Sequence, residues 1–215
     1  MKDAKLQQDV MNELNWDPSI HAEEIGVAVK DGVVTLSGMV RTYAEKLVAE
    51  KAAKRVRGVK AVAEDIEVKV TTSMKRNDTE IAKAAVDAQA WDVEVPHERI
   101  QLKVEDGWIT LEGSVDWEFQ RSAAARAVSN LLGVRGVTNL ITLKRRLETT
   151  EIKRRLADAF KRNAELEAQS IQVDASDGRV VLRGKVHSWQ QHDEATRVIW
   201  SAPGVMDVED HLVVA

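Results

Sequence analysis

The chain has 215 residues, with 31 basic and 35 acidic side chains, a net charge of −4 at pH 7 and no cysteine. This balance excludes the overall basic field that draws a domain to nucleic acid, and the missing cysteines exclude disulfides, thiolate metal sites and a cysteine nucleophile. No run of 18 apolar residues occurs, so we expect no transmembrane segment. No signal-peptide core is present near the start, so we expect a cytoplasmic protein, or a periplasmic one if a leader was removed.

The same landmarks recur three times along the chain, first after 75 and then after 71 residues. The most obvious landmark is an Asp-Gly pair, present as Asp31-Gly32, Asp106-Gly107 and Asp177-Gly178. Nine glycines in all mark equivalent positions: Gly32, Gly38, Gly58, Gly107, Gly113, Gly133, Gly178, Gly184 and Gly204. Fixed-period self-similarity predicts three small copies of one folding unit, over residues 1–70, 79–145 and 149–215.

Each unit begins with a helix followed by a hairpin, as the first copy illustrates. Apolar residues at helical spacing from Leu6 predict a helix that ends before about Asp17. The alternation over residues 25–29 predicts a half-buried strand, and the Asp-Gly pair predicts a tight turn into a second strand over residues 34–40. Gly38 lies on the apolar face of this strand, where we expect the backbone of a helix to approach the sheet.

A second helix and a third strand complete the unit. Small side chains at positions 49, 52 and 53 form a narrow apolar stripe on a helix that Gly58 ends, and alternation over residues 62–68 predicts the third strand. The hairpin strands are antiparallel, whereas a helical crossover makes the second and third strands parallel. We therefore predict an α+β fold, in which each unit is a two-layer sandwich of two helices on one face of a small mixed three-stranded sheet.

The three units resemble the BON (bacterial OsmY and nodulation) domain family. The resemblance rests on the runs DGVVTLSGMV, DGWITLEGSV and DGRVVLRGKV, each followed by a helix and a Gly-Val landmark. It implies a protein of osmotic or envelope stress that binds phospholipid surfaces or partner proteins, and some cytosolic relatives bind potassium. These landmarks are structural glycines rather than catalytic groups, so we expect no enzyme and no cofactor.

Residues found in one copy only are candidates for a lipid or partner surface. Trp108, Trp189 and Trp200 each replace a different residue type in the other copies, which suits contacts that are apolar on one side and wet on the other. A basic segment crosses the link between the second and third units and could attract anionic lipid, although a solvated helix face explains it comparably well. Its residues are Lys144, Arg145, Arg146, Lys153, Arg154 and Arg155.

Packing between the copies, either within one chain or in a homo-oligomer, is the alternative role for the tryptophans and the one that we favour. The short connection over residues 145–148 predicts that the third unit lies close to the second, whereas the polar stretch over 71–78 should leave the first two units freer.

Catalysis or cation binding is the other alternative to a binding surface. The histidines share no repeat position, and the series Asp31, Asp106 and Asp177 is explained by the hairpin turns, so we predict no catalytic residues. One polar position recurs on the inner face of the third strand, as Glu64, Asn139 and Asp210. It indicates either hydrogen bonding inside each unit or an oxygen ligand set for a cation such as potassium, the former being favoured. We predict no metal site.

Overall fold

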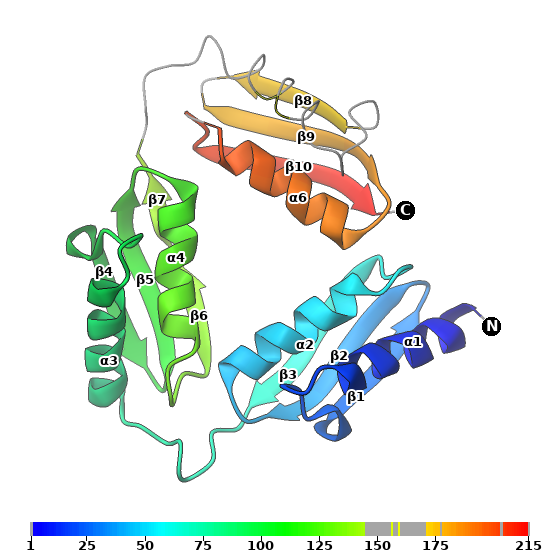
Figure 1. Cartoon of the computed structure of the whole chain (residues 1–215), viewed down its shortest axis with the longest axis horizontal. Helices are drawn as coiled ribbons and strands as arrows, with labels where there is room; N and C mark the ends of the chain where they lie inside the picture. Colours follow the sequence, from blue (N-terminus) through cyan, green and yellow to red (C-terminus); the bar gives the residue numbers. More distant parts are fainter. Residues whose placement is uncertain are drawn as a thin grey trace.

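A computed structural model describes residues 2–144, 156, 159, 171–176, 178–202 and 204–214. The three predicted units follow one another along the chain (Figure 1). The first contains α1 (Lys2–Trp16), η1 (Ala22–Glu24), β1 (Ile25–Lys30), β2 (Val33–Val40), α2 (Tyr43–Arg55) and β3 (Ala61–Val68). The second contains α3 (Asp78–Trp91), η2 (His97–Arg99), β4 (Ile100–Glu105), β5 (Trp108–Val115), α4 (Glu118–Ser129), β6 (Gly136–Asn139) and β7 (Thr142–Leu143). The third contains β8 (Ile171–Ser176), β9 (Arg179–Val186), α6 (Trp189–Trp200) and β10 (Asp207–Val214).

The sheets confirm the predicted α+β topology. In each unit the first two strands are antiparallel, the third is parallel to the second, and the second strand lies in the middle. The third strand of the second unit is interrupted after Asn139, whose side-chain oxygen accepts the Ile141 N–H at 3.2 Å. The register is unchanged across this break, since Leu111 pairs with Asn139 and Ser114 pairs with Thr142.

The hairpin turns are tied to the first helix of their own unit. Asp31 and Gly32 both have positive φ, of 53° and 83°, as a two-residue type I′ turn requires. An aspartate at the start of the first helix accepts turn N–H groups: Asp3 accepts one from Asp31 at 3.0 Å. In the second unit Asp78 accepts two, from Asp106 and Gly107, both at 2.9 Å. The prediction for Asp177 falls outside the described residues.

The role we expected for the strand glycines was wrong. All nine landmark glycines have positive φ, but Gly38 and Gly113 do not make room for a long helix. A Cβ on either would clash with a carbonyl oxygen just before the first strand, that of Glu24 or Arg99. With φ of 124° and 140°, these glycines direct the position of the missing side chain toward the last residue of a short 3-10 helix. The alternation pattern could not reveal this, because it carries no information about φ.

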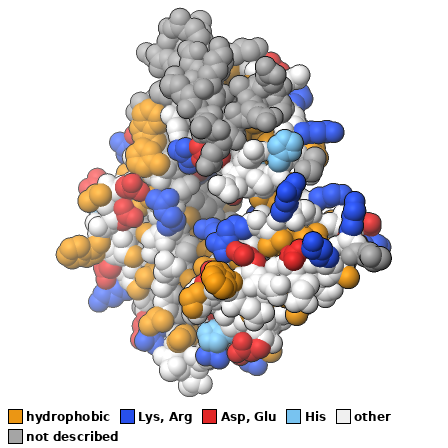
Figure 2. All heavy atoms as spheres, turned by 45° about the vertical axis from the view of Figure 1, so that its right-hand side comes forward, with side chains coloured by type: hydrophobic (Ala, Val, Ile, Leu, Met, Phe, Trp, Pro, Cys, Tyr) orange, Lys and Arg blue, Asp and Glu red, His pale blue; other side chains and the backbone are white. Residues whose placement is uncertain are grey.

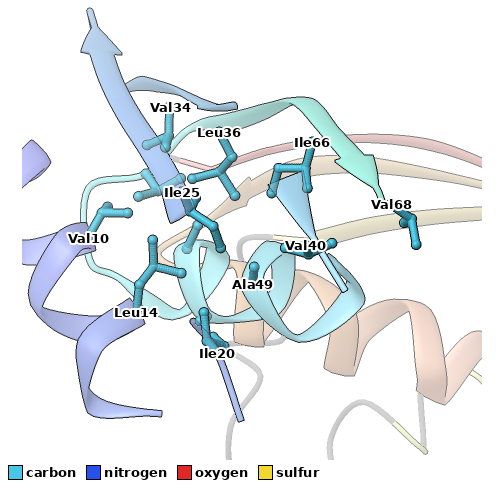
Figure 3. Close-up of a cluster of buried hydrophobic side chains, with 13 residues drawn as sticks. Val10, Leu14, Ile20, Ile25, Val34, Leu36, Val40, Ala49, Ile66 and Val68 are labelled. Atoms are coloured by element: carbon cyan, nitrogen blue, oxygen red, sulfur yellow. The ribbon is translucent and has the colours of Figure 1, made fainter. Parts of the chain in front are cut away.

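Each unit buries its own apolar cluster against one sheet face, which is covered by both helices in the first two units and by α6 in the described part of the third. Figure 3 shows the first cluster, with Val10 and Leu14 of α1 opposite Val34 and Leu36 of β2. The predicted small-residue stripe of α2 is buried at Ala49, Ala52 and Ala53, which lets this helix pack closely. The other sheet face is largely exposed. Among the described residues, no helix is long and apolar enough to cross a membrane.

Candidate functional site

The structure separates the three tryptophans that the sequence singled out. Trp189 and Trp200 are the first and last residues of α6. Trp108 begins β5 on the exposed face of the second sheet, where its indole N–H donates to the Thr138 hydroxyl at 2.8 Å and its ring covers Gly136. These three residues therefore do not form a single surface. On the face shown in Figure 2, acidic and basic side chains are interspersed and apolar side chains protrude in small groups.

Both tryptophans of α6 contact other units. The half-buried Trp189 packs against the apolar cluster of the first unit, and the Lys54 ammonium lies 5.1 Å from a ring centroid. Arg121 of the second unit lies over Trp200, with its guanidinium carbon 4.8 Å from a ring centroid. Both are cation–π contacts, which stabilise by about 0.5 to 2 kcal/mol each depending on desolvation. The alternative role of packing between copies thus describes Trp189 and Trp200, whereas Trp108 stays on the surface of its own unit.

The third unit does not lie against the second in the way its short connection suggested. Its helix α6 packs against α2 of the first unit, and the two helices border a cleft of about 400 Å³. Helix α6 also contacts the second unit, where Arg121 lies over Trp200. The connection length could not predict this, because it limits how far apart two units can be without choosing the neighbour.

Only one residue of the predicted basic segment can be placed. Lys144 is exposed at the end of the second unit. The other members lie outside the described residues: Arg145, Arg146, Lys153, Arg154 and Arg155. A second basic group, not singled out from the sequence, lines a cleft of about 530 Å³ between the first two units, with Lys69, Lys75, Arg76 and Arg135 around Asp78 and Asp106.

The most exposed tryptophans were not among the sequence candidates. Trp16 and Trp91 are the last residues of α1 and α3, and these residues are 84% and 87% exposed. Leu14 is buried, and Trp16 lies roughly 200° further around the helix, so it points away from the core. In the second unit the exposed Val93 adds to this apolar end. The signal was present in the sequence: two tryptophans at the same repeat position, both off the buried helical stripe.

The recurring polar position on the third strand is satisfied within each unit by the second helix. Asn139 donates to the Arg121 carbonyl oxygen at 2.8 Å, and a carboxylate oxygen of Asp210 lies 2.8 Å from His192 Nε2. Glu64 lies 3.8 Å from the Lys46 ammonium. Burial raises the pKa of Glu64 above its ordinary value, with Lys46 opposing this effect. This pattern supports internal hydrogen bonding, and the described part of the chain holds no cluster of three or more possible metal ligands.

The first unit carries an ionisable helix cap that the others replace by an amide. Glu45 is only 6% exposed, and its carboxylate accepts N–H groups from His21 at 2.8 Å and Arg41 at 3.0 Å. Gln120 and Gln191 accept the corresponding N–H groups in the other two units. Burial acts to raise the pKa of Glu45, but the hydrogen bonds from His21 and Arg41 outweigh it and hold this pKa below its ordinary value.

Comparisons with known proteins agree with this architecture. A protein-family model for the BON domain matches residues 2–70, 77–145 and 148–215. The chain is 30% identical over 148 residues to Osmotically-inducible protein Y of Escherichia coli (strain K12), covering 67% of this chain and 74% of that protein.

Two solved structures of CdsD, a structural protein of the type III secretion system of Chlamydia trachomatis, are 16% identical and cover 98% of this chain. The matches span 92% and 97% of those chains, with TM-scores of 0.28 and 0.27, values too low to support a conclusion about this protein. The three family matches account for nearly the whole sequence, and each holds the hairpin, crossover helix and positive-φ glycines described above. The chain therefore belongs to the BON domain family, with three copies in tandem.

Proposed function

We propose that this chain is a non-enzymatic protein of the osmotic-stress response that associates with anionic phospholipid surfaces. The stress association is supported by the similarity to Osmotically-inducible protein Y. The membrane association rests on the exposed pair Trp16 and Trp91. An indole ring is apolar on its faces and carries one polar N–H, so it suits the boundary between water and lipid.

Burial supports assigning this pair to an external contact. Trp16 and Trp91 add almost nothing to their own cores, because the two residues remain 84% and 87% exposed to water. Their common position gives two successive units the same apolar projection at the end of the first helix. Two weak anchors on one chain bind a surface more tightly than either alone, because the second attachment is intramolecular.

The preference for anionic lipid is supported by basic groups outside these helix ends. Exposed Lys69, Lys75, Arg76 and Arg135 border the cleft between the first two units, and Lys144 is also exposed. Each basic group near an anionic membrane surface contributes about 1 kcal/mol, and this contribution falls off within a Debye length. Acidic residues such as Asp92 and Glu94 lie close to Trp91 in sequence, so we assign the apolar and electrostatic contributions to different residues.

Vesicle cosedimentation tests the proposal directly. The wild-type chain should sediment with phosphatidylglycerol vesicles at low salt, less so at moderate salt, and weakly with phosphatidylcholine. The double variant Trp16→Ala/Trp91→Ala should lose most of this binding. Phe119→Ala is the matched control, since Phe119 is an exposed aromatic residue at the start of α4 that is 52% exposed. Absence of wild-type binding at low salt contradicts the proposal, as does undiminished binding by the double variant.

The competing roles considered from the sequence have less support. A potassium-responsive site would need the oxygens of Glu64, Asn139 and Asp210, but these face partners within their own units. A self-assembling protein joined through tryptophans would need Trp189 and Trp200, and these two contact other units of the same chain.

A further inference from the structure

We propose that the first turns of the second helix form a docking surface by which each BON unit binds the next, and that these contacts close the chain into a three-membered ring. The inference is independent of the lipid proposal. It starts from the equivalence of positions in the three copies. Tyr43, Glu118 and Trp189 begin the three second helices, whereas Lys54, Ser129 and Trp200 lie at or next to their ends.

The contacts between units run in one direction around the molecule. Trp189 at the start of α6 meets Lys54 near the end of α2, so the third unit docks on the first. Arg121 near the start of α4 meets Trp200 at the end of α6, so the second unit docks on the third. The three second helices lie toward the middle of the molecule, where the units approach one another (Figure 1).

Tyr43 completes the circuit from the first unit to the second. Its side chain packs against the apolar clusters of both the first and the second unit. Each unit therefore uses the start of its second helix to reach the next one. A head-to-tail interface either continues into a filament or closes into a ring, depending on the rotation between neighbours. Here the contact of Trp189 with Lys54 returns from the third unit to the first, so the ring closes within one chain.

The junction of the third and first units has the chemistry of a buried interface rather than of two solvated surfaces. At the junction of the third and first units, Trp189 Nε1 is buried without a hydrogen-bond partner in the described part of the chain, while the ring packs on apolar neighbours and on Lys54. Burying an indole N–H in this way is unfavourable, so the apolar and cation–π contacts must outweigh it. At the two junctions that involve α6, the partner is the end of another BON second helix, through Lys54 of α2 or Trp200 of α6. At the remaining junction Tyr43 packs against the apolar cluster of the second unit instead.

Cross-linking tests the ring, because the chain has no cysteine of its own. Lys51 of α2 and Gln190 of α6 both line the cleft between these two helices. The variant Lys51→Cys/Gln190→Cys should give a rapid intramolecular product with a short bismaleimide at low protein concentration. The control pair is Lys51→Cys/Lys185→Cys, since Lys185 is exposed on β9 and does not line this cleft. Equal cross-linking rates for the two pairs would overturn the proposal.

The tryptophan dependence of the same reaction tests the docking residues. Adding Trp189→Ala/Trp200→Ala to the first cysteine pair should slow cross-linking several-fold and increase the radius of gyration in small-angle scattering. Trp189→Phe retains an aromatic face without the unpartnered N–H, and should restore most of the rate when Trp200 is kept. Amide NMR spectra of the three units report whether each core stays folded. An unchanged rate and radius in the alanine variant, with folded units, contradict the proposal.

Discussion

Gln89 occupies in the second unit the core position that Leu14 occupies in the first. Both side chains lie on the buried face of the first helix, with exposed fractions of 2% and 1%. The Gln89 side-chain nitrogen is buried without a hydrogen-bond partner in the described part of the structure. An unsatisfied buried polar group of this kind costs about 1 to 3 kcal/mol.

Replacing Gln89 should stabilise the second unit. We predict that Gln89→Leu raises its free energy of unfolding by about 1 to 3 kcal/mol, because the leucine has a similar volume and leaves no unpaired polar atom. The reverse change, Leu14→Gln, should destabilise the first unit by a similar amount. Hydrogen exchange of amides in β5 and β2 measures the two units separately. A loss of stability in Gln89→Leu would mean that the amide has a partner that the structure does not show.

The helix cap of the first unit should make its stability sensitive to acid. The folded pKa of Glu45 is depressed, so its contribution is complete above the unfolded value of about 4.3 and is lost as pH falls through the lower folded pKa. We predict that Glu45→Gln reduces the difference in the free energy of unfolding between pH 7 and pH 3. Denaturant titrations of the first unit's signals at both pH values measure this difference.

The control for the cap is Glu67→Gln, at an exposed position on β3. This variant should keep the wild-type pH dependence. If the two glutamine variants behave alike at both pH values, the Glu45 cap is not the source of the acid sensitivity.

The turn contacts of the first helices predict a difference between two equivalent aspartates. Asp78 accepts two turn N–H groups, whereas Asp3 accepts one. Asp78→Ala should therefore destabilise its unit by about 1 to 3 kcal/mol, and Asp3→Ala its own unit by less. Thermal unfolding of the two single variants provides the measurement. A larger destabilisation by Asp3→Ala than by Asp78→Ala would show that the number of turn hydrogen bonds does not determine the effect of the substitution.

The second strand of the first unit should not tolerate a side chain at Gly38. We predict that Gly38→Ala destabilises the first unit by at least about 1 to 3 kcal/mol, since φ is 124° and the added Cβ would clash with the Glu24 carbonyl oxygen. Gly26→Ala is the control, because its φ is not in the strained range and its added Cβ would meet only Ser37. Equal effects of the two substitutions in denaturant titrations would reject this explanation.

Comparison among the copies predicted the topology of each unit because the signals involved are local. The spacing of Val10 and Leu14, the Asp31-Gly32 turn and the alternation over β3 each report on neighbouring residues, and all three patterns recur. The structural role of Gly38 could not be predicted, because a positive φ does not change the hydrophobic alternation of a strand. The partners of Trp189 and Tyr43 could not be predicted either, since the periodicity inside a unit does not determine which other unit it meets.

The helix α3 joins two regions with different chemistry. Its first residue, Asp78, borders the basic cleft at the junction of the first two units, and its last residue is Trp91. Fourteen helical residues span roughly 21 Å. If a surface holds the Trp91 indole in place, the length of α3 fixes the distance between that surface and the junction of the first two units. Helix α3 therefore acts as a rigid spacer whose length is set by its number of turns.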